Sequence, residues 1–381
     1  MRHRLKRREI GAWHPMTGPG FEVLRTSFPA HARRGPVRLS EAPADGTMWL
    51  DTETTGLAAG TGTQVFLIGV AFREGVHVVI EQYLLRRLGA ERSMLEVVRD
   101  RLGQASVLVT YNGRRFDWPL LEVRFRLQRL SLPWDEPPHL DLLPVARRLW
   151  RQPVGTARLT AIEWEVLGHR RDRDIPGGLI PSRYIEFLRS GDDALLEDVV
   201  DHNREDVLTL LSLHALADAI CDGRSPPVPV DPIGLGLHLE RLGRQDRALE
   251  AYERALAEEC DPGRRWTAVR RLARLYRTRG DGRRLFALWM AEAERAILPA
   301  QVSLRRAARV ARHVLRDPEA ALAVVDRALA RAEWDGLRGR MQLSGIATLE
   351  RMRARLVRSS AGRPRRPADG SSPDKDGVCR S

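Results

Sequence analysis

Three stretches that lie far apart in the chain carry carboxylates at spacings that suit a metal site. Asp51 and Glu53 follow an apolar segment, and residues two apart on a strand face the same side. Asp117 lies in the first turn of an expected helix, just after an Asn-Gly turn. His202 and Asp206 are four apart in an apolar-periodic run, so they share a helix face. Carboxylates in such an arrangement can hold two divalent metals, and Mg²⁺ and Mn²⁺ prefer oxygen ligands.

Each stretch taken alone also suits an ordinary structural role. Asp51 and Glu53 could be solvated turn residues, Asp117 a helix cap, and His202 with Asp206 a surface pair, because acidic residues near element ends are common. The ordered set of three favours a metal site over three unrelated roles.

The three stretches resemble the exonuclease motifs of the DEDD 3′-to-5′ exonucleases of the ribonuclease H-like superfamily. The matching segments are Asp51-x-Glu53-Thr54-Thr55-Gly56-Leu57, Asn112-Gly113-x-x-Phe116-Asp117-x-Pro119-Leu120-Leu121 and His202-x-x-x-Asp206. More narrowly, the chain is similar to the bacterial YprB-like family, through a run that includes His139-Leu140-Asp141 and Asp174-Ile175-Pro176-Gly177. The resemblance covers about residues 46–217.

The resemblance implies a metal-dependent 3′-5′ exonuclease that releases nucleoside 5′-monophosphates from DNA or RNA, with two Mg²⁺ or Mn²⁺ ions as cofactors. Asp51, Glu53, Asp117 and Asp206 would be the metal ligands. His202 would be the catalytic base, because an imidazole exchanges a proton near neutral pH. The family places a Tyr four residues, or a His five residues, before the last Asp. Here His202 stands four residues before Asp206, so the spacing follows one subgroup and the side chain the other.

Other residues in and near the motifs are candidates for contact with nucleic acid. Three of these candidates could instead have structural roles: Gly56 as a turn glycine, Leu57 as a core residue and Asn112 as a turn former. We expect Asp141 to have a structural role. The candidates are Thr54, Thr55, Gly56, Leu57, Asn112, Arg114 and Arg115, with wider arginine clusters formed by Arg124, Arg126, Arg129, Arg147, Arg148 and Arg151.

Composition agrees with a nucleic-acid partner and an enzyme of two units. The formal net charge is +13, but only Lys6 and Lys375 are lysines among 63 basic residues. This skew is typical of a GC-rich genome, so the placement of arginines is more informative than their total. The three cysteines have no paired spacing, which disfavours disulfides and a zinc site. Because no apolar run approaches the ~20 residues of a membrane span and no signal peptide is evident, we expect a cytoplasmic protein.

The apolar pattern predicts the elements that must position these side chains. Strands are expected at 47–51, 65–72 and 76–84, a helix at 91–103, a strand at 106–110, a helix at 117–130, a short strand at 139–143, and mostly helix to 217. This order predicts an α/β fold for residues 46–217, a ribonuclease H-like mixed sheet flanked by helices. Residues 1–45 are expected to form a basic arm or loosely packed lead-in, and 218–230 a linker.

Residues 231–358 are expected to form an all-α domain of tetratricopeptide-like (TPR-like) repeats, followed by a disordered tail at 359–381. Small and aromatic residues fall at the positions of that 34-residue pattern in the first repeat: Leu235, Gly236, Gly243, Ala248, Tyr252 and Ala255. Later repeats match less well, so a plain helical bundle is the alternative. The repeats could hold a protein partner.

Two other functions stay open. A non-catalytic nucleic-acid-binding or TPR adaptor could keep the fold, although the presence of all four carboxylates disfavours it. A structure-specific endonuclease of the same superfamily would share the metals and differ only in cutting a strand without a free 3′ end. The choice between DNA and RNA depends on contacts to the sugar 2′ position, which no motif specifies.

Overall fold

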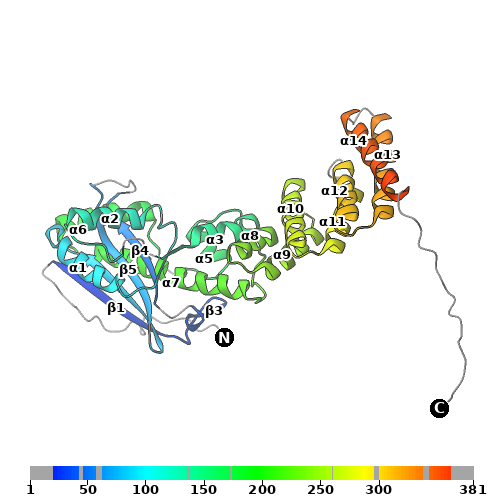
Figure 1. Ribbon diagram of the computed structural model, residues 1–381. Coiled ribbons are helices and arrows are strands. Elements are labelled where there is room, and N and C mark those ends of the chain that lie inside the picture. The colour runs from blue at the N-terminus through cyan, green and yellow to red at the C-terminus, as the bar shows by residue number, and fades with distance from the viewer. Residues whose placement is uncertain are drawn as a thin grey trace, which may run out of the picture. The chain divides into compact units, whose positions relative to one another are not determined.

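A computed structural model describes residues 20–42, 46–56, 62–134, 138–171, 174–259, 261–295, 300–337 and 343–361. The chain divides into two compact units, Met1–Ala251 and Tyr252–Ser381. The first unit has a mixed sheet flanked by helices, and the second is built of helices (Figure 1). No helix in the described ranges is long and apolar enough to cross a membrane.

A six-stranded sheet in the order β1-β6-β5-β4-β7-β8 forms the centre of the first unit. β1, β6, β5 and β4 pair antiparallel, whereas β7 pairs parallel with β4 and β8 parallel with β7. The central strand β5 is apolar on both faces over Val65–Phe72, which requires cover on both sides. The strands are β1 (Phe21–Pro29), β4 (Thr47–Thr54), β5 (Val65–Glu74), β6 (His77–Leu85), β7 (Val107–Thr110) and β8 (His139–Asp141), with a separate hairpin of β2 (Arg33–Arg34) and β3 (Val37–Arg38).

Helices flank the sheet and close one continuous apolar core with it. Two of them matter most for the site. α2 begins at Asp117 directly after β7 and its turn, and the long α7 crosses the sheet beside β4 and β5 (Figure 1). The helices of this unit are α1 (Glu91–Leu102), α2 (Asp117–Leu127), α3 (Leu142–Leu149), α4 (Arg151–Val154), α5 (Leu159–Glu165), α6 (Ile180–Ser190), α7 (Ala194–Cys221) and α8 (Pro232–Arg241), with short 3₁₀ turns at Leu39–Glu41, Leu88–Ala90 and Gly177–Leu179.

The ribonuclease H-like sheet flanked by helices is confirmed, and its strands and helices lie within a few residues of their expected positions. The expectation of a loosely packed lead-in is wrong for residues 21–29, which form β1 at the edge of the sheet. Its apolar residues Phe21, Val23, Leu24 and Phe28 are buried. The strand lies between Arg-, Pro- and Gly-rich flanks, which hide its pattern in the sequence.

The linker begins later than expected, because α7 continues to Cys221 and buries Ile220 and Cys221. The boundary between the compact units is also later than the expected linker. α8 packs so closely on α3 that a Cβ added at Gly234 would lie 1.7 Å from the carbonyl oxygen of Arg148. α8 therefore belongs to the first unit.

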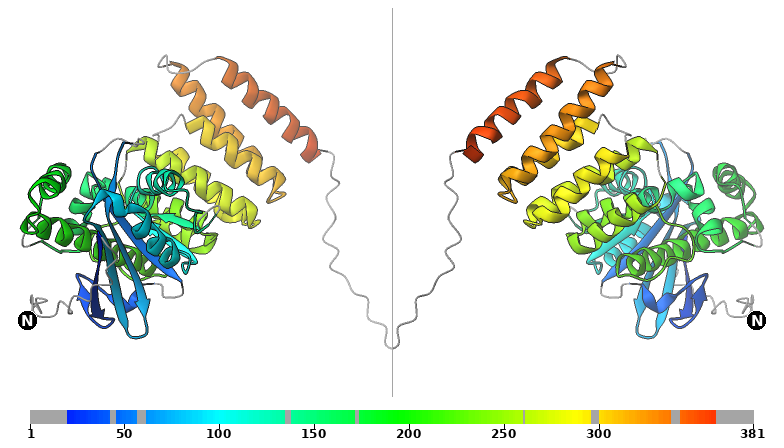
Figure 2. Two further views of the ribbon diagram at one scale, coloured as in Figure 1. Left: turned by 90° about the vertical axis from the view of Figure 1, so that its left-hand side faces the viewer. Right: turned by 90° about the vertical axis from the view of Figure 1, so that its right-hand side faces the viewer.

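Successive helices of the second unit pack side by side (Figure 2). They are α9 (Gln245–Ala257, shared with the first unit), α10 (Pro262–Thr278), α11 (Gly282–Glu294), α12 (Ala300–His313), α13 (Pro318–Leu337) and α14 (Leu343–Ala361). Within it, Arg265 and Glu292 form a buried ion pair between α10 and α11. An all-helical C-terminal region is thus confirmed, while its assignment to TPR-like repeats stays a prediction. α14 continues to Ala361, so the tail expected at 359–381 begins later than expected, and the rest of it lies outside the described residues.

Candidate active site

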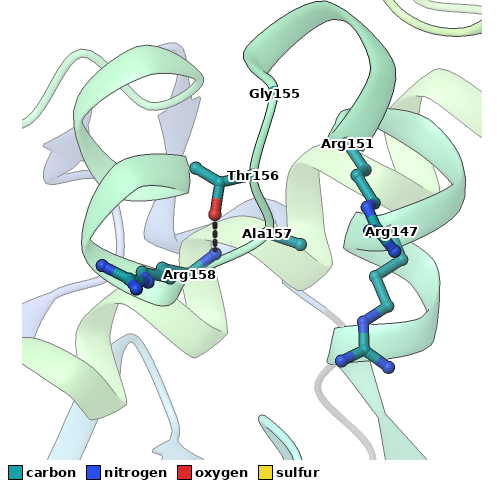
Figure 3. A pocket seen from close by; sticks show the side chains of 6 residues that line it. All are labelled: Arg147, Arg151, Gly155, Thr156, Ala157 and Arg158. Atoms are coloured by element: carbon teal, nitrogen blue, oxygen red, sulfur yellow. Dashed lines mark hydrogen bonds between the residues drawn. The ribbon is translucent and has the colours of Figure 1, made fainter.

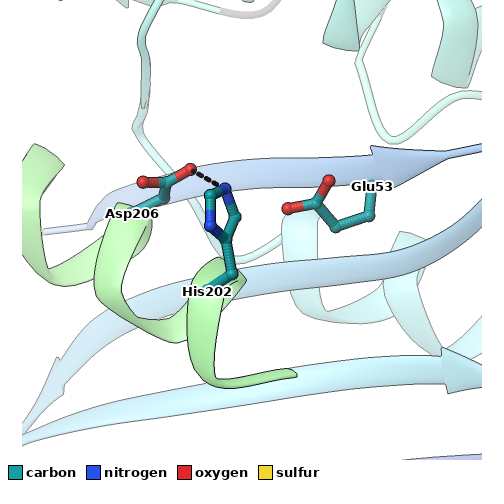
Figure 4. A group of neighbouring side chains, drawn as sticks. All are labelled: Glu53, His202 and Asp206. Carbon is teal, nitrogen blue, oxygen red and sulfur yellow. Dashed lines mark ion pairs between the residues drawn. The ribbon is translucent and has the colours of Figure 1, made fainter. Parts of the chain in front are cut away.

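The fold brings the three sequence motifs together at the end of β4. Glu53 projects from β4, while His202 and Asp206 project from successive turns of α7 (Figure 4). Ligand atoms of these three residues all lie within 4.8 Å of one another. The register of β4 against β5 shifts between Glu53 and Thr54, and such an irregularity is a common device for aiming side chains at a site.

Asp51 is held by a buried asparagine that spans three strands. Asn203 of α7 donates from Nδ2 to Asp51 Oδ2 at 3.0 Å, and Gln82 of β6 donates from Nε2 to Asn203 Oδ1 at 3.0 Å. Gly69 of β5 pairs with both Asp51 and Gln82 and lies beneath this bridge. A Cβ at Gly69 would lie 2.2 Å from Asn203 Oδ1, so only glycine lets α7 approach this closely.

Asp117 is the first residue of α2, where the helix dipole favours a negative charge. Thr52, which lies between Asp51 and Glu53 on β4, donates from Oγ1 to Asp117 Oδ1 at 2.6 Å. This bond ties the second motif to the first.

His202 lies between two carboxylates. Its Nδ1 is 2.6 Å from Asp174 Oδ1, and its Nε2 is 3.3 Å from Asp206 Oδ2. Asp174 therefore orients the ring from one side, which leaves Nε2 directed at the carboxylate cluster. A carboxylate on Nδ1 is the usual device for setting the orientation of a working histidine.

Arg171 is a buried cation in contact with the site. It donates to Asp206 Oδ1, and its Nε donates to Glu163 Oε2 at 2.8 Å. Glu163 is also bonded to Arg34 NH2 at 2.7 Å, and Arg34 NH1 lies 2.9 Å from Glu205. Glu163 and Glu205, with His169, form a second group that could hold a metal. Because two arginines already neutralise it, this second group is better explained as a structural network that anchors Arg171.

The carboxylates strongly perturb one another. Burial raises the pKa of Asp51 well above its ordinary value, and the charges of Asp206, Glu53 and Asp117 raise it further. Burial likewise raises the pKa of Glu53 to about 8 and that of Asp117 to about 6. Three carboxylates are thus crowded without enough positive charge among the described residues.

Asp206 and His202 behave as a charged pair. Burial is the largest single influence and opposes the charge on each, but their mutual hydrogen bond and the neighbouring charges together outweigh it. The hydrogen bond and the charges of Arg171 and His202 lower the pKa of Asp206. The same bond, with Asp206, Glu53 and Asp174, raises the pKa of His202 to about 9.

The residues present fit divalent metals. Four carboxylates, three of them with raised pKa values, form a hard-oxygen donor set that Mg²⁺ or Mn²⁺ would satisfy and neutralise. Asp51, Glu53, Asp117 and Asp206 are the candidate ligands.

Among the candidates for nucleic-acid contact, Thr54, Thr55 and Gly56 directly follow Glu53 along the chain. Thr54 Oγ1 donates to Gly56 O at 2.7 Å, and Thr55 exchanges backbone and side-chain bonds with Gln64, so the segment after β4 is held by its own hydrogen bonds. Leu57 lies outside the described residues. Arg114 and Arg115 are exposed beside the second motif.

Three other residues near the motifs have structural roles. Asn112 has a positive φ of 67°, as a turn former does, and its N–H donates to Asp141 Oδ1 at 2.7 Å. Asp141 also caps α3 through the N–H of Leu143. Arg124 was expected in a phosphate-contacting cluster, but it is buried and bonded to Glu91. It is a core ion pair because α2 turns this residue inward.

Among the residues of the site that carried no assigned role in the sequence are Gly69, Arg171, Asp174 and Asn203. Asp174 lies in the run shared with the YprB-like family, and Asn203 lies one residue after His202. Their positions therefore indicated that they lie near the site, but not what they do there. Arg171 stands among several arginines, and Gly69 in an apolar strand, and nothing local distinguishes either.

A comparison with family models agrees with this architecture. Residues 48–217 match the family model described as RNase_H superfamily. An uncharacterized protein, YprB of Bacillus subtilis (strain 168), is 35% identical over 216 residues, which is 56% of this chain and 52% of that protein. The chain thus spans about half the length of this relative. The solved family B DNA polymerase of Pyrobaculum calidifontis is similar at 17% identity, with a TM-score of 0.37 over 62% of this chain and 29% of the polymerase. Residues 48–217 therefore carry an RNase H-like domain, followed by a helical region.

Proposed function

We propose that the chain is a metal-dependent 3′-5′ exonuclease that hydrolyses phosphodiester bonds of DNA or RNA and releases nucleoside 5′-monophosphates. The observation that carries the proposal is the convergence of Asp51, Glu53, Asp117 and Asp206 beside His202 on an RNase H-like sheet. Action from a 3′ end follows from the likeness of the motifs, since the RNase H-like fold also serves enzymes that cut within a strand.

The roles follow from the contacts. Asp51, Glu53, Asp117 and Asp206 would hold two Mg²⁺ or Mn²⁺ ions, which supply charge neutralisation at the phosphate and activation of water. Asn203 and Thr52 fix the carboxylates of Asp51 and Asp117. Asp174 would hold His202 at Nδ1. Nε2 pairs with Asp206 in the metal-free protein, and it would take a proton from the attacking water once Asp206 serves as a metal ligand and no longer holds the ring in its charged form.

Contacts with the strand would come from the motif segments. Thr54, Thr55, Gly56 and Leu57 would meet the terminal nucleotide, and the exposed Arg114 and Arg115 would contact phosphates. Asn112 would act through the backbone turn that it forms. The helical region would hold a protein partner or lengthen the path of the nucleic acid.

The test uses single strands of DNA and of RNA, labelled at the 3′ or the 5′ end, with Mn²⁺ and a circular strand of each kind. We expect early loss of the 3′ label, a descending ladder of 5′-labelled products and intact circles. Asp51→Asn and His202→Gln should abolish or strongly reduce cleavage.

Other outcomes identify the other functions. Cleavage of the circles would establish an endonuclease. Binding of linear strands without any cleavage in Mn²⁺ or Mg²⁺ would favour the adaptor. Cleavage by Asp51→Asn at the wild-type rate would place the activity elsewhere or in a contaminant.

A further inference from the structure

A hollow of about 260 Å³ lies between α3, α4 and the start of α5 (Figure 3). It is several times larger than the roughly 30 Å³ that one water takes, so a phosphate group fits. Its lining is polar and carries three cationic side chains: Arg147, Arg151, Gly155, Thr156, Ala157 and Arg158 line it. We call this hollow the arginine pocket.

The arginines of this pocket lack counter-ions. Arg147, Arg151 and Arg158 are exposed, and none of them forms an ion pair with any residue whose placement the structure describes. This differs from the buried Arg34, Arg124 and Arg171, which are all bonded to carboxylates. Arg147 lies in the last turn of α3 and Arg151 is the first residue of α4, and both line the pocket, so their like charges repel across it. An anion in the pocket would remove that repulsion.

Two further donors belong to backbone N–H groups of residues that line the same hollow. Gly155 adopts a left-handed φ of 82° where α4 ends, and this conformation reverses the chain between α4 and the segment that leads to Arg158. The N–H groups of Thr156 and Ala157 after this turn have no hydrogen-bond acceptor within the described ranges. Free backbone N–H groups after a left-handed residue are typical of anion sites.

Hydrogen bonds connect the second sequence motif, around Asn112, to the segment that lines the pocket and to α3. Tyr111, which directly precedes Asn112, donates from Oη to the carbonyl oxygen of Ala157 at 2.6 Å. Asn112 donates its N–H to Asp141, the residue that caps the helix carrying Arg147. The turn that leads into Asp117 is therefore bonded to the pocket wall and to the helix behind it. A strand whose end reaches Asp117 would have further phosphates close to this pocket.

We propose that the arginine pocket binds a backbone phosphate of the nucleic-acid strand, separate from the phosphodiester that is cleaved. The pocket would hold the strand in register while its end lies among the carboxylates. This inference deepens the proposed exonuclease function and rests on it for the identity of the ligand. Binding of the strand, however, can be measured without cleavage.

The experiment measures the affinity of the full chain for labelled single strands of DNA and RNA by fluorescence anisotropy, in EDTA and over a series of salt concentrations. The variant is Arg147→Gln/Arg151→Gln. The matched control is Arg87→Gln/Arg189→Gln, which removes two exposed arginines from the side of the sheet where β6 and α6 lie. Each strand phosphate contact contributes about 0.7 to the slope of log affinity against log salt. We expect the pocket variant to lose about five- to tenfold in affinity and roughly 0.7 to 1.4 in slope, and the control to keep the wild-type slope.

An unchanged slope in the pocket variant, or an equal change in the control, would overturn the proposal. A competition arm with inorganic phosphate separates the two sources of the ligand. If millimolar phosphate binds the wild type but not the pocket variant, while strand affinity is the same for both, the pocket serves free phosphate and the proposal is wrong.

A parallel cleavage assay in Mn²⁺ separates this proposal from the exonuclease function. If the pocket variant loses affinity but the wild type cuts nothing, binding of a strand phosphate in the pocket is supported and the proposal of exonuclease activity is wrong. If the variant binds and cuts like the control, the pocket fails and the catalytic proposal stands.

Discussion

Arg171 donates a hydrogen bond to Asp206 Oδ1 while the same guanidinium is fastened to Glu163 at 2.8 Å. Asp206 therefore has a fixed cationic neighbour that is itself held by a buried carboxylate. This arrangement positions one of the four candidate ligands and offsets part of the negative charge of the cluster. Such outer contacts commonly decide how well a metal site works.

Replacing Arg171 with methionine should lower the cleavage rate by about 10- to 100-fold at saturating strand and Mn²⁺. Methionine fills much of the same space but cannot hold the Asp206 carboxylate, and it leaves Glu163 with one cationic partner fewer. The measurement is kcat for release of mononucleotides, with urea unfolding to check that the variant folds.

The matched control is Arg170→Met. Arg170 is the neighbouring arginine, but it is exposed and stacks on Trp164 at 3.7 Å, outside the carboxylate cluster. Its rate should stay within about twofold of wild type, in line with the small effects of most surface changes. Equal rates in both variants would show that Arg171 does not position Asp206.

Replacing Asp51 with asparagine should stabilise the metal-free protein while abolishing its response to metal. The raised pKa of Asp51 shows that its charge is unfavourable in this cluster, and the new amide oxygen can still accept from Asn203. In EDTA at pH 7.5 we expect a gain on the order of 1 kcal/mol in the free energy of unfolding.

With Mn²⁺ at about 100 times its dissociation constant, the wild type should gain about 2.7 kcal/mol. Asp51→Asn should gain much less, and Asp198→Asn, an exposed change on α7, should respond like the wild type. Urea unfolding with and without Mn²⁺ measures both effects. A variant that is less stable in EDTA, yet gains as much from Mn²⁺ as the wild type, would contradict a role for Asp51 as a ligand.

Replacing Gly69 with alanine should push α7 away from the sheet. The added Cβ would meet Asn203 Oδ1 at 2.2 Å and Val207 Cγ2 at 2.9 Å, in a part of the core that has no spare room. Overpacking of this kind costs about 1–3 kcal/mol. Because α7 carries His202 and Asp206, we also expect cleavage to fall by more than tenfold at a temperature where the variant is folded.

Gly89→Ala is the control, since nothing lies within 4 Å of a Cβ at Gly89. Urea unfolding and the cleavage rate should both stay near wild type there. If Gly69→Ala lowers stability but leaves the rate unchanged, the position of α7 does not limit catalysis.

The candidate site was predictable where its geometry is local. Asp51 and Glu53 share a face because they are two apart on β4, and His202 and Asp206 because they are four apart on α7. The contacts of Arg171 and Asn203 were not predictable, since they depend on how closely two distant elements approach. β1 was missed for a related reason: its burial comes from pairing with β6, far along the chain.

His238 should make stability depend on pH. It is buried on α8, and its Nδ1 has no hydrogen-bond partner in the described part of the chain. Burial, followed by the charges of Arg148, Arg241 and Arg244, lowers its pKa to about 4. In the unfolded chain the imidazole of His238 becomes protonated below about pH 6.5, whereas in the folded chain it becomes protonated only near pH 4. The stability tied to the neutral ring is thus complete above pH 6.5 and declines as the pH falls.

Between pH 7.5 and pH 5 this decline should remove about 2 kcal/mol from the free energy of unfolding of the wild type. His238→Gln removes the titrating group, so its stability should fall by about 2 kcal/mol less over the same interval. His31→Gln, an exposed change in the same unit, should lose as much stability as the wild type. The other titrating groups are common to all three proteins, so they do not affect the comparison. The measurement is urea unfolding at both pH values. Parallel declines in all three would show that His238 can accept a proton without loss of packing.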